Sequence, residues 1–160
     1  MASKMADPVR QLEHTHGHLN ELAVDVKRLL AEESTSAEAR AELISALELL
    51  RDELLTHFAN EEEALFPFIR ANVPSKAGAV ERLEGAHDAI CGSVTRLVYL
   101  AAHEGDAAAL GGLHRRFESA YTEHSQMEAM LFDELARGLT AIQRGELAVL
   151  MRGVAGGHST

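Results

Sequence analysis

Apolar residues recur along most of the chain at intervals of three and four positions, the spacing that places them on one face of an α-helix. No run of alternating β-branched residues indicates a β-strand. The pattern predicts four long helices, over about 8–33, 36–71, 76–104 and 106–138, and a shorter fifth helix over about 140–152. Short connections between long helices favour an all-α fold, an up-down-up-down four-helix bundle followed by the short fifth helix.

Helix-breaking and capping residues mark where the predicted helices begin and end. Pro8 suits a first helical turn, and the sequence STS at 34–36 supplies hydroxyl caps for the second helix. The sequence NVPS at 72–75 interrupts the apolar pattern, Gly105 suits a helix end, and the Asp106 side chain can cap the fourth helix.

The chain of 160 residues is long enough to bury one apolar core, and 46% of its residues are hydrophobic. We therefore expect a single domain over residues 1–160. The bundle is predicted over about 8–138 and the fifth helix over about 140–152. The C-terminal sequence GVAGGHST, at 153–160, is predicted to form a flexible tail.

The segment LEHTHGHL carries three histidines at alternate positions, and a helix directs them to different sides. At about 100° per residue, His16 falls on the apolar stripe that contains Leu12 and Leu19. His14 and His18 fall outside that stripe and are expected to face solvent. The sequence therefore predicts that only His16 points into the bundle.

Each of the other long helices also places one histidine on its apolar face, and two of them add a glutamate one turn later. These residues are His57 and Glu61 on the second helix, His87 on the third, and His124 and Glu128 on the fourth. An internal repeat supports this arrangement, because LEHTHGHL aligns with LEGAHDAI at 83–90, and HFANEEEALF echoes HSQMEAMLF. We expect two related helix hairpins to bring all six side chains together.

Two further features of the second helix concern the surroundings of this cluster. Glu62 and Glu63 are predicted to lie on a solvated face. Pro67 has no amide hydrogen to donate to the carbonyl of Glu63, so we expect a kink just beyond the inward His57 and Glu61.

A metal explains such a cluster better than core packing does. One histidine on an apolar stripe is more often a satisfied core residue than a ligand. Two buried carboxylates are different, because burial costs several kcal/mol for each unless it is paired or bound to a metal. Four histidines and two glutamates differ from a structural zinc site, which is usually tetrahedral and often rich in cysteine, and suggest two borderline metals such as iron.

The order His, His-x-x-x-Glu, His, His-x-x-x-Glu, with the sequence LFP at 65–67, resembles the hemerythrin-like, or HHE cation-binding, family. The resemblance extends from about Val9 to Ala136. It implies two non-haem irons, bridged by an oxo or hydroxo group, that are held by all six residues. These are His16, His57, Glu61, His87, His124 and Glu128. Proteins of this kind carry oxygen, sense oxygen or iron, or respond to peroxide or nitric oxide.

Two departures from the pattern of the oxygen carriers bear on the role. Those proteins place a second histidine where this chain has Leu83, and they end the last motif as His-x-x-x-x-Asp, where this chain has Glu128. Oxygen carriage is therefore disfavoured. Cys91, one turn after His87, is either a substitute ligand or a small core residue, and the second interpretation is favoured. Tyr121 is a candidate hydrogen-bond donor near the metal.

The sequence favours a protein that binds or senses O2, peroxide or NO over an enzyme, and it assigns no catalytic residue. A catalytic scavenger of peroxide or NO and an iron storage or sensing protein remain alternatives, and a metal-free interaction module ranks last. A ferritin-like oxidase is disfavoured because the Glu-x-x-His pattern is absent.

The net charge of the chain disfavours two classes of binding partner. A formal net charge of -10 would repel nucleic acid and anionic lipid, so we expect neither as a partner. No apolar stretch is long enough for a membrane span, and a single cysteine agrees with a reducing compartment. We therefore expect a cytoplasmic protein whose partner is a small diatomic or peroxide ligand; no protein partner is indicated.

Overall fold

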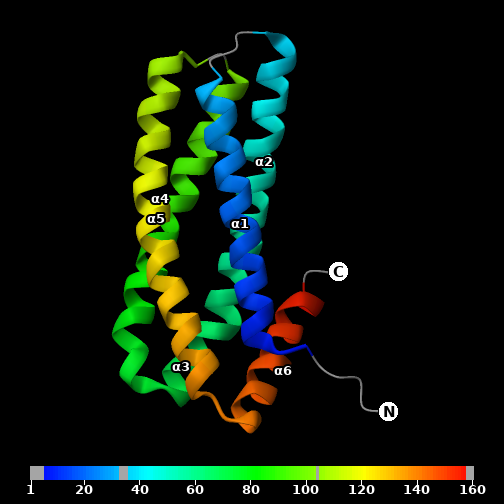
Figure 1. The fold of residues 1–160 in the computed structure, drawn as a ribbon, viewed down its shortest axis with the longest axis vertical. Helices are drawn as coiled ribbons and strands as arrows, with labels where there is room; N and C mark the ends of the chain where they lie inside the picture. The colour runs from blue at the N-terminus through cyan, green and yellow to red at the C-terminus, as the bar shows by residue number, and fades with distance from the viewer. Residues whose placement is uncertain (1–5, 33–35, 104, 158–160) are drawn as a thin grey trace.

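The computed structural model describes residues 6–32, 36–103 and 105–157, and this part of the chain is almost entirely helical (Figure 1). The elements are α1 (Pro8–Ala31), α2 (Ala37–Asn60), the π-helical turn η1 (Glu61–Leu65), α3 (Phe66–Asn72), the 3-10 turn η2 (Pro74–Lys76), α4 (Ala77–Ala102), α5 (Ala107–Gly138) and α6 (Ala141–Gly157). Within the described residues there is no β-strand. The all-α prediction is confirmed.

The long helices form a closed bundle. Helix α1 packs against α2 and α5, and α4 packs against the same two helices, while α2, η1 and α3 follow one another without a break and form one long element. Figure 1 shows the end of α1 beside the start of α2, and the end of α4 beside the start of α5, at one end of the bundle, with α6 towards the other end. The up-down-up-down bundle with a fifth helix is therefore as predicted. No helix among the described residues is both long and apolar enough to cross a membrane.

The helix starts follow the caps that the sequence indicates. The side chains of Asp7, Ser36 and Asp106 accept hydrogen bonds from backbone amides at the starts of α1, α2 and α5. The chain turns closely after α4, where the Gly105 amide donates to the Leu100 carbonyl at 2.7 Å. A Cβ on Gly105 would lie 2.8 Å from that carbonyl oxygen, so glycine is required there. The predicted helix ends at 33 and 104 and the predicted caps at 34 and 35 lie outside the described residues.

Helix α6 is longer than the sequence predicts. It continues to Gly157, so the expectation of a flexible tail from residue 153 is wrong as far as Gly157; residues 158–160 lie outside the described part. The helix docks at the start of α1, because Arg144 forms an ion pair with Asp7 at 2.6 Å and also donates to the Ala136 carbonyl. Docking against the bundle stabilises a helix whose glycine-rich sequence has low helix propensity.

The irregularity in the second long element begins earlier than predicted. The backbone widens into a π-helical turn over Glu61–Leu65, in which the Phe66 amide donates to the Glu61 carbonyl five residues back. Pro67 follows this turn, in the first turn of α3, where a missing amide hydrogen is tolerated. The structure thus shows a widened turn that starts at Glu61 itself, and the kink beyond it stays a prediction. Such turns occur frequently at functional sites.

Two apolar clusters fill the bundle, and the six inward residues predicted from the sequence lie between them on the long helices. The first cluster includes Leu19, Leu54, Phe58, Ile90 and Tyr121; the second includes Leu12, Leu65, Leu83, Leu131 and Phe132. On α1, for example, the polar residue His16 stands between Leu12 of one cluster and Leu19 of the other. The fold thus encloses a polar layer between two dry layers.

Candidate metal centre

The structure buries all six side chains that the sequence predicts to point inward. The exposed fractions are 8% for His16, 3% for His87 and His124, 2% for His57, 1% for Glu128 and 0% for Glu61. His14 and His18 are exposed, as the helical spacing predicts. On α1 the helical arc therefore separates the inward histidine from the outward ones correctly, whereas α5 buries a second histidine, His114, besides the predicted His124. The role of the six residues as metal ligands stays a prediction.

Donor atoms from five of the six side chains form two overlapping groups. Glu61, His87 and His124 form one group, and His57, Glu61 and Glu128 form the other; within each group the donor atoms lie within 4.8 Å of one another. Glu61 belongs to both groups. Each group combines residues from both helix hairpins, so neither hairpin could form the centre alone.

The closest contacts in these groups join imidazole nitrogens to carboxylate oxygens. His57 Nε2 lies 2.5 Å from Glu61 Oε1 and 2.8 Å from Glu128 Oε1. His87 Nε2 lies 2.9 Å from Glu61 Oε2, and His124 Nε2 lies 3.1 Å from Glu128 Oε2. Each glutamate therefore places its two oxygens next to different histidines, as a carboxylate does when it bridges two metal ions.

Several of these close atoms are oriented unsuitably for hydrogen bonds with each other. Among the described residues, both carboxylate oxygens of Glu61 and the Nε2 atoms of His87 and His124 are buried and have no hydrogen-bond partner. Unpaired buried polar atoms are costly unless something else satisfies them. A metal ion coordinated by their lone pairs would do so. The donor set, four imidazoles and two carboxylates, fits such a metal.

Burial and charge shift the pKa values of the groups in the centre. Burial alone would lower the pKa of His57, but the charge of Glu61 and the hydrogen bond with Glu128 outweigh it and raise this pKa to about 10. Burial and the negative charge of Glu128 raise the pKa of Glu61. Without metal, His57 therefore holds a proton at neutral pH, and metal binding at its nitrogen would displace that proton.

His87 is fixed on three sides. Its ring stacks on Phe58 with ring centres 3.7 Å apart and also on Phe66 with ring centres 5.6 Å apart. Its Nδ1 lies 2.6 Å from a carboxylate oxygen of Glu62. A carboxylate behind a metal-binding histidine fixes the ring and the tautomer. Glu62 is exposed, as predicted, and its carboxylate also hydrogen-bonds His87, a contact that the sequence does not predict. The π-helical turn, which helical spacing does not indicate, determines this position.

His16 has different surroundings. Its Nε2 lies 3.0 Å from the Ser125 hydroxyl and 3.9 Å from the nearest oxygen of Glu128. The Ser125 hydroxyl also donates to Asn20 Oδ1 at 3.1 Å, and the Tyr121 hydroxyl donates to the same oxygen at 2.6 Å. Burial lowers the pKa of His16, although the charge of Glu128 opposes this. The helical pattern does not identify Asn20 and Ser125 as residues of the site, because both lie beside the apolar stripe of their helix and not on it.

Tyr121 and Cys91, which the sequence offers as a hydrogen-bond donor and a substitute ligand, lie outside the two donor groups. Tyr121 hydrogen-bonds Asn20 rather than any of the six inward residues. Cys91 is half-buried against the first apolar cluster. Burial, and then the charges of Asp88 and Glu62, raise the pKa of Cys91 to about 11, so it is a neutral thiol at physiological pH. A thiolate is the form that binds metals, so the structure favours packing for Cys91.

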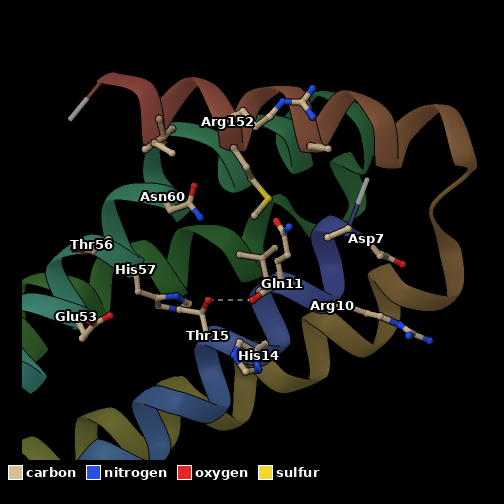
Figure 2. A pocket seen from close by; sticks show the side chains of 16 residues that line it. Asp7, Arg10, Gln11, His14, Thr15, Glu53, Thr56, His57, Asn60 and Arg152 are labelled. Carbon is tan, nitrogen blue, oxygen red and sulfur yellow. Dashed lines mark hydrogen bonds between the residues drawn. The ribbon is translucent and has the colours of Figure 1, made fainter. Parts of the chain in front are cut away.

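A cavity of about 1050 Å³ opens beside the centre, between α1, α2 and α6. His57 contributes to its wall and is the only one of the six inward residues to do so. Figure 2 shows His57 facing Thr15, with Asn60 and Arg152 nearer α6. The Thr15 hydroxyl donates to the Gln11 carbonyl at 3.0 Å. The cavity thus extends as far as one candidate ligand, although the His57 side chain itself is almost fully buried.

The fold and the donor set together define a helical-bundle protein with a buried His/Glu cluster able to hold metal. The family model described as "Hemerythrin HHE cation binding domain" matches residues 7–148, which include all six inward residues. The chain belongs to this family. No curated protein and no solved structure matches the chain.

Proposed function

We propose that the chain is a non-haem diiron protein that binds or senses a small oxidant, O2, peroxide or NO, in the core of its bundle. The observation that supports this most directly is the sharing of Glu61 between two donor groups. A carboxylate whose two oxygens face different histidines suits a pair of ions better than a single ion. Iron accepts both imidazole and carboxylate ligands, so this donor set suits it.

The number of ligands leaves room for an oxidant. Two six-coordinate irons offer about twelve positions, and four histidines, two bridging glutamates and one bridging oxygen would fill about ten of them. Bound iron would supply the open positions and the electrons. The six residues would hold the metal, and no step requires a protein nucleophile.

The surroundings of the cluster support ligand binding in a dry site. Apolar clusters lie on both sides of the polar layer along the bundle and exclude bulk water. The cavity beside His57 gives a small molecule a place next to the centre without unfolding a helix. Most residues in the wall of this cavity are polar, so the cavity is an approach to the centre from solvent, and the dry part of the site lies between the apolar clusters.

Metal analysis of the purified chain tests the proposal. About two irons per chain and a near-ultraviolet absorption band that changes on addition of O2, peroxide or NO are the expected results. Purified chain that fails to bind iron after anaerobic addition of Fe²⁺ would overturn the proposal. Repeated consumption of peroxide or NO by the loaded protein would instead support a catalytic scavenger.

A further inference from the structure

One of the four inward histidines stands apart from the donor groups. Two donors about 2.1 Å from a shared ion lie about 3.0 to 3.4 Å apart at the usual coordination angles. Three of the histidines meet a carboxylate oxygen at or within this separation, at 2.5 to 3.1 Å. His16 Nε2 lies 3.9 Å from Glu128 Oε2, and it belongs to neither donor group among the described residues.

The nitrogen of His16 that is nearest to Glu128 already forms a hydrogen bond with another residue. His16 Nε2 and the Ser125 hydroxyl are 3.0 Å apart, within hydrogen-bond distance. Whichever atom donates, the bond occupies either the lone pair or the hydrogen of Nε2. A metal needs the lone pair with the hydrogen removed, so His16 Nε2 cannot bind Ser125 and a metal ion together.

Ser125 keeps a second hydrogen-bond partner, Asn20, if its hydrogen bond with His16 breaks. Its hydroxyl donates to Asn20 Oδ1 at 3.1 Å, and that oxygen also accepts from Tyr121. The hydroxyl hydrogen therefore stays satisfied if the imidazole moves to a metal. The network thus offers His16 two states, one bound to Ser125 and one released.

We propose that Ser125 is a positioning residue that competes with metal for His16, so that the two metal positions of this centre fill unequally. The inference rests on the two-metal centre of the proposed function. The position formed by Glu61, His87 and His124 fills first, because its donors converge and His87 is clamped by Phe58 and Glu62. The position that His16 completes fills second, because its fourth protein ligand must first leave Ser125.

Titration of the full-length, metal-free protein with Zn²⁺ tests the order of filling. Zn²⁺ is diamagnetic, so the imidazole ¹⁵N resonances can be followed by NMR, with the His16 resonance assigned from a His16→Gln variant. We expect the His87 and His124 Nε2 resonances to shift over the first equivalent and the His16 Nε2 resonance to shift over the second. Simultaneous shifts of all of them would overturn the proposal, as would a His16 shift in the first equivalent.

Calorimetric Zn²⁺ titration of Ser125→Ala tests the competition. Removing the competing hydrogen bond should make the second Zn²⁺ bind about twofold to tenfold tighter, while the first keeps its affinity. Ser125→Thr keeps the hydroxyl and should restore the wild-type value. Ser119→Ala, an exposed serine on the same helix, is the matched control and should change neither affinity.

Tighter binding of the second Zn²⁺ in Ser125→Ala indicates that Ser125 competes with the metal. If Ser125 only supported the structure of the site, its removal would weaken binding. Unchanged or weaker binding of the second Zn²⁺ in Ser125→Ala would overturn the inference and leave the metal centre intact. Failure of the wild-type chain to bind a second ion, of either Zn²⁺ or Fe²⁺, would overturn the inference and the two-metal function together.

Discussion

His16 on α1 and His87 on α4 come from the two copies of the internal repeat, and both lie buried in the bundle. Their surroundings differ nonetheless. His87 is stacked between two aromatic rings, and its two nitrogens lie within hydrogen-bond distance of two carboxylates. His16 faces a hydroxyl and stands farther from its nearest carboxylate. The comparison shows that a repeated helical frame sets the face on which a side chain lies, and the adjacent helix sets its partners.

The adjacent helices differ at two equivalent positions. The residue after His57 is Phe58, which stacks on His87, whereas the residue after His124 is Ser125, which contacts His16. The residue after Glu61 is Glu62, which hydrogen-bonds His87, whereas Ala129 follows Glu128 and has no polar side chain. The α2 side also contains the π-helical turn, and α5 is a regular helix throughout. The repeat is therefore preserved in the inward residues and lost in those that support them.

The largest effect is expected at Glu61, because it serves both halves of the centre. Glu61→Gln should abolish tight binding of both ions, since each donor group loses the one carboxylate that the two groups share. Metal content per chain measures this. Glu63→Gln, which changes an exposed glutamate two residues away, should retain the full content. Retention of both ions in Glu61→Gln would show that Glu61 is not a ligand.

The next effect compares the two histidines directly. His87→Ala should weaken binding of one ion by more than about 100-fold, because it removes a clamped ligand. His16→Ala should cause a smaller loss that is confined to the second ion. The double variant His14→Ala with His18→Ala is the control, and it should keep the wild-type affinities because both side chains are exposed. An equal loss of metal affinity in His16→Ala and His87→Ala would contradict the proposal that the two metal positions bind unequally.

A smaller effect is expected from the carboxylate behind His87. Glu62→Gln keeps the shape of the side chain and removes its charge, so the ring of His87 is held less firmly and binds metal less strongly. We expect a loss of about tenfold to 100-fold for the first ion. Anaerobic calorimetry with Fe²⁺ measures it. Glu63→Gln again serves as the control, and an unchanged affinity in Glu62→Gln would show that the hydrogen bond does not contribute.

The smallest effect concerns protonation of the metal-free chain. For His87, burial lowers the pKa, but the charges of Glu61 and Glu62 and the hydrogen bond with Glu62 outweigh it, so the pKa lies above its usual 6.5. The resulting stabilisation is present below pH 6.5 and is lost as the pH rises through the folded-state pKa. For His16, burial holds the pKa below 6.5, so stability falls as the pH drops below 6.5. NMR titration should find His87 protonating at a higher pH than His16.

An added carboxylate can make the two surroundings more alike. Ala129→Glu places a carboxylate at the position on α5 that corresponds to Glu62, and it should raise the pKa of His16 in the metal-free chain. Ala129→Gln is the neutral control of the same size. A pKa of His16 that is equal in the two variants would mean that the two hairpins are not related closely enough for the carboxylate to approach His16.

Much of the centre could be predicted because helical spacing is a local property. Leu12, Leu19 and the inward His16 follow from intervals of three and four residues, and the same holds on each long helix. Burial of two carboxylates among histidines then indicates a metal from elementary energetics. The partners of His16 and His87 could not be predicted in this way, because they come from other helices.

The sequence by itself determined the helices, the face that each one buries and the six inward residues that the family pattern shares, because these depend on contacts within a single helix and on its caps. The tertiary structure decided which inward residues meet, how Glu61 serves both groups and why Ser125 meets His16. It also decided the π-helical turn and the length of α6, which depend on packing against neighbouring helices. Such contacts join residues far apart in the chain, and their geometry is set only when all four long helices pack together.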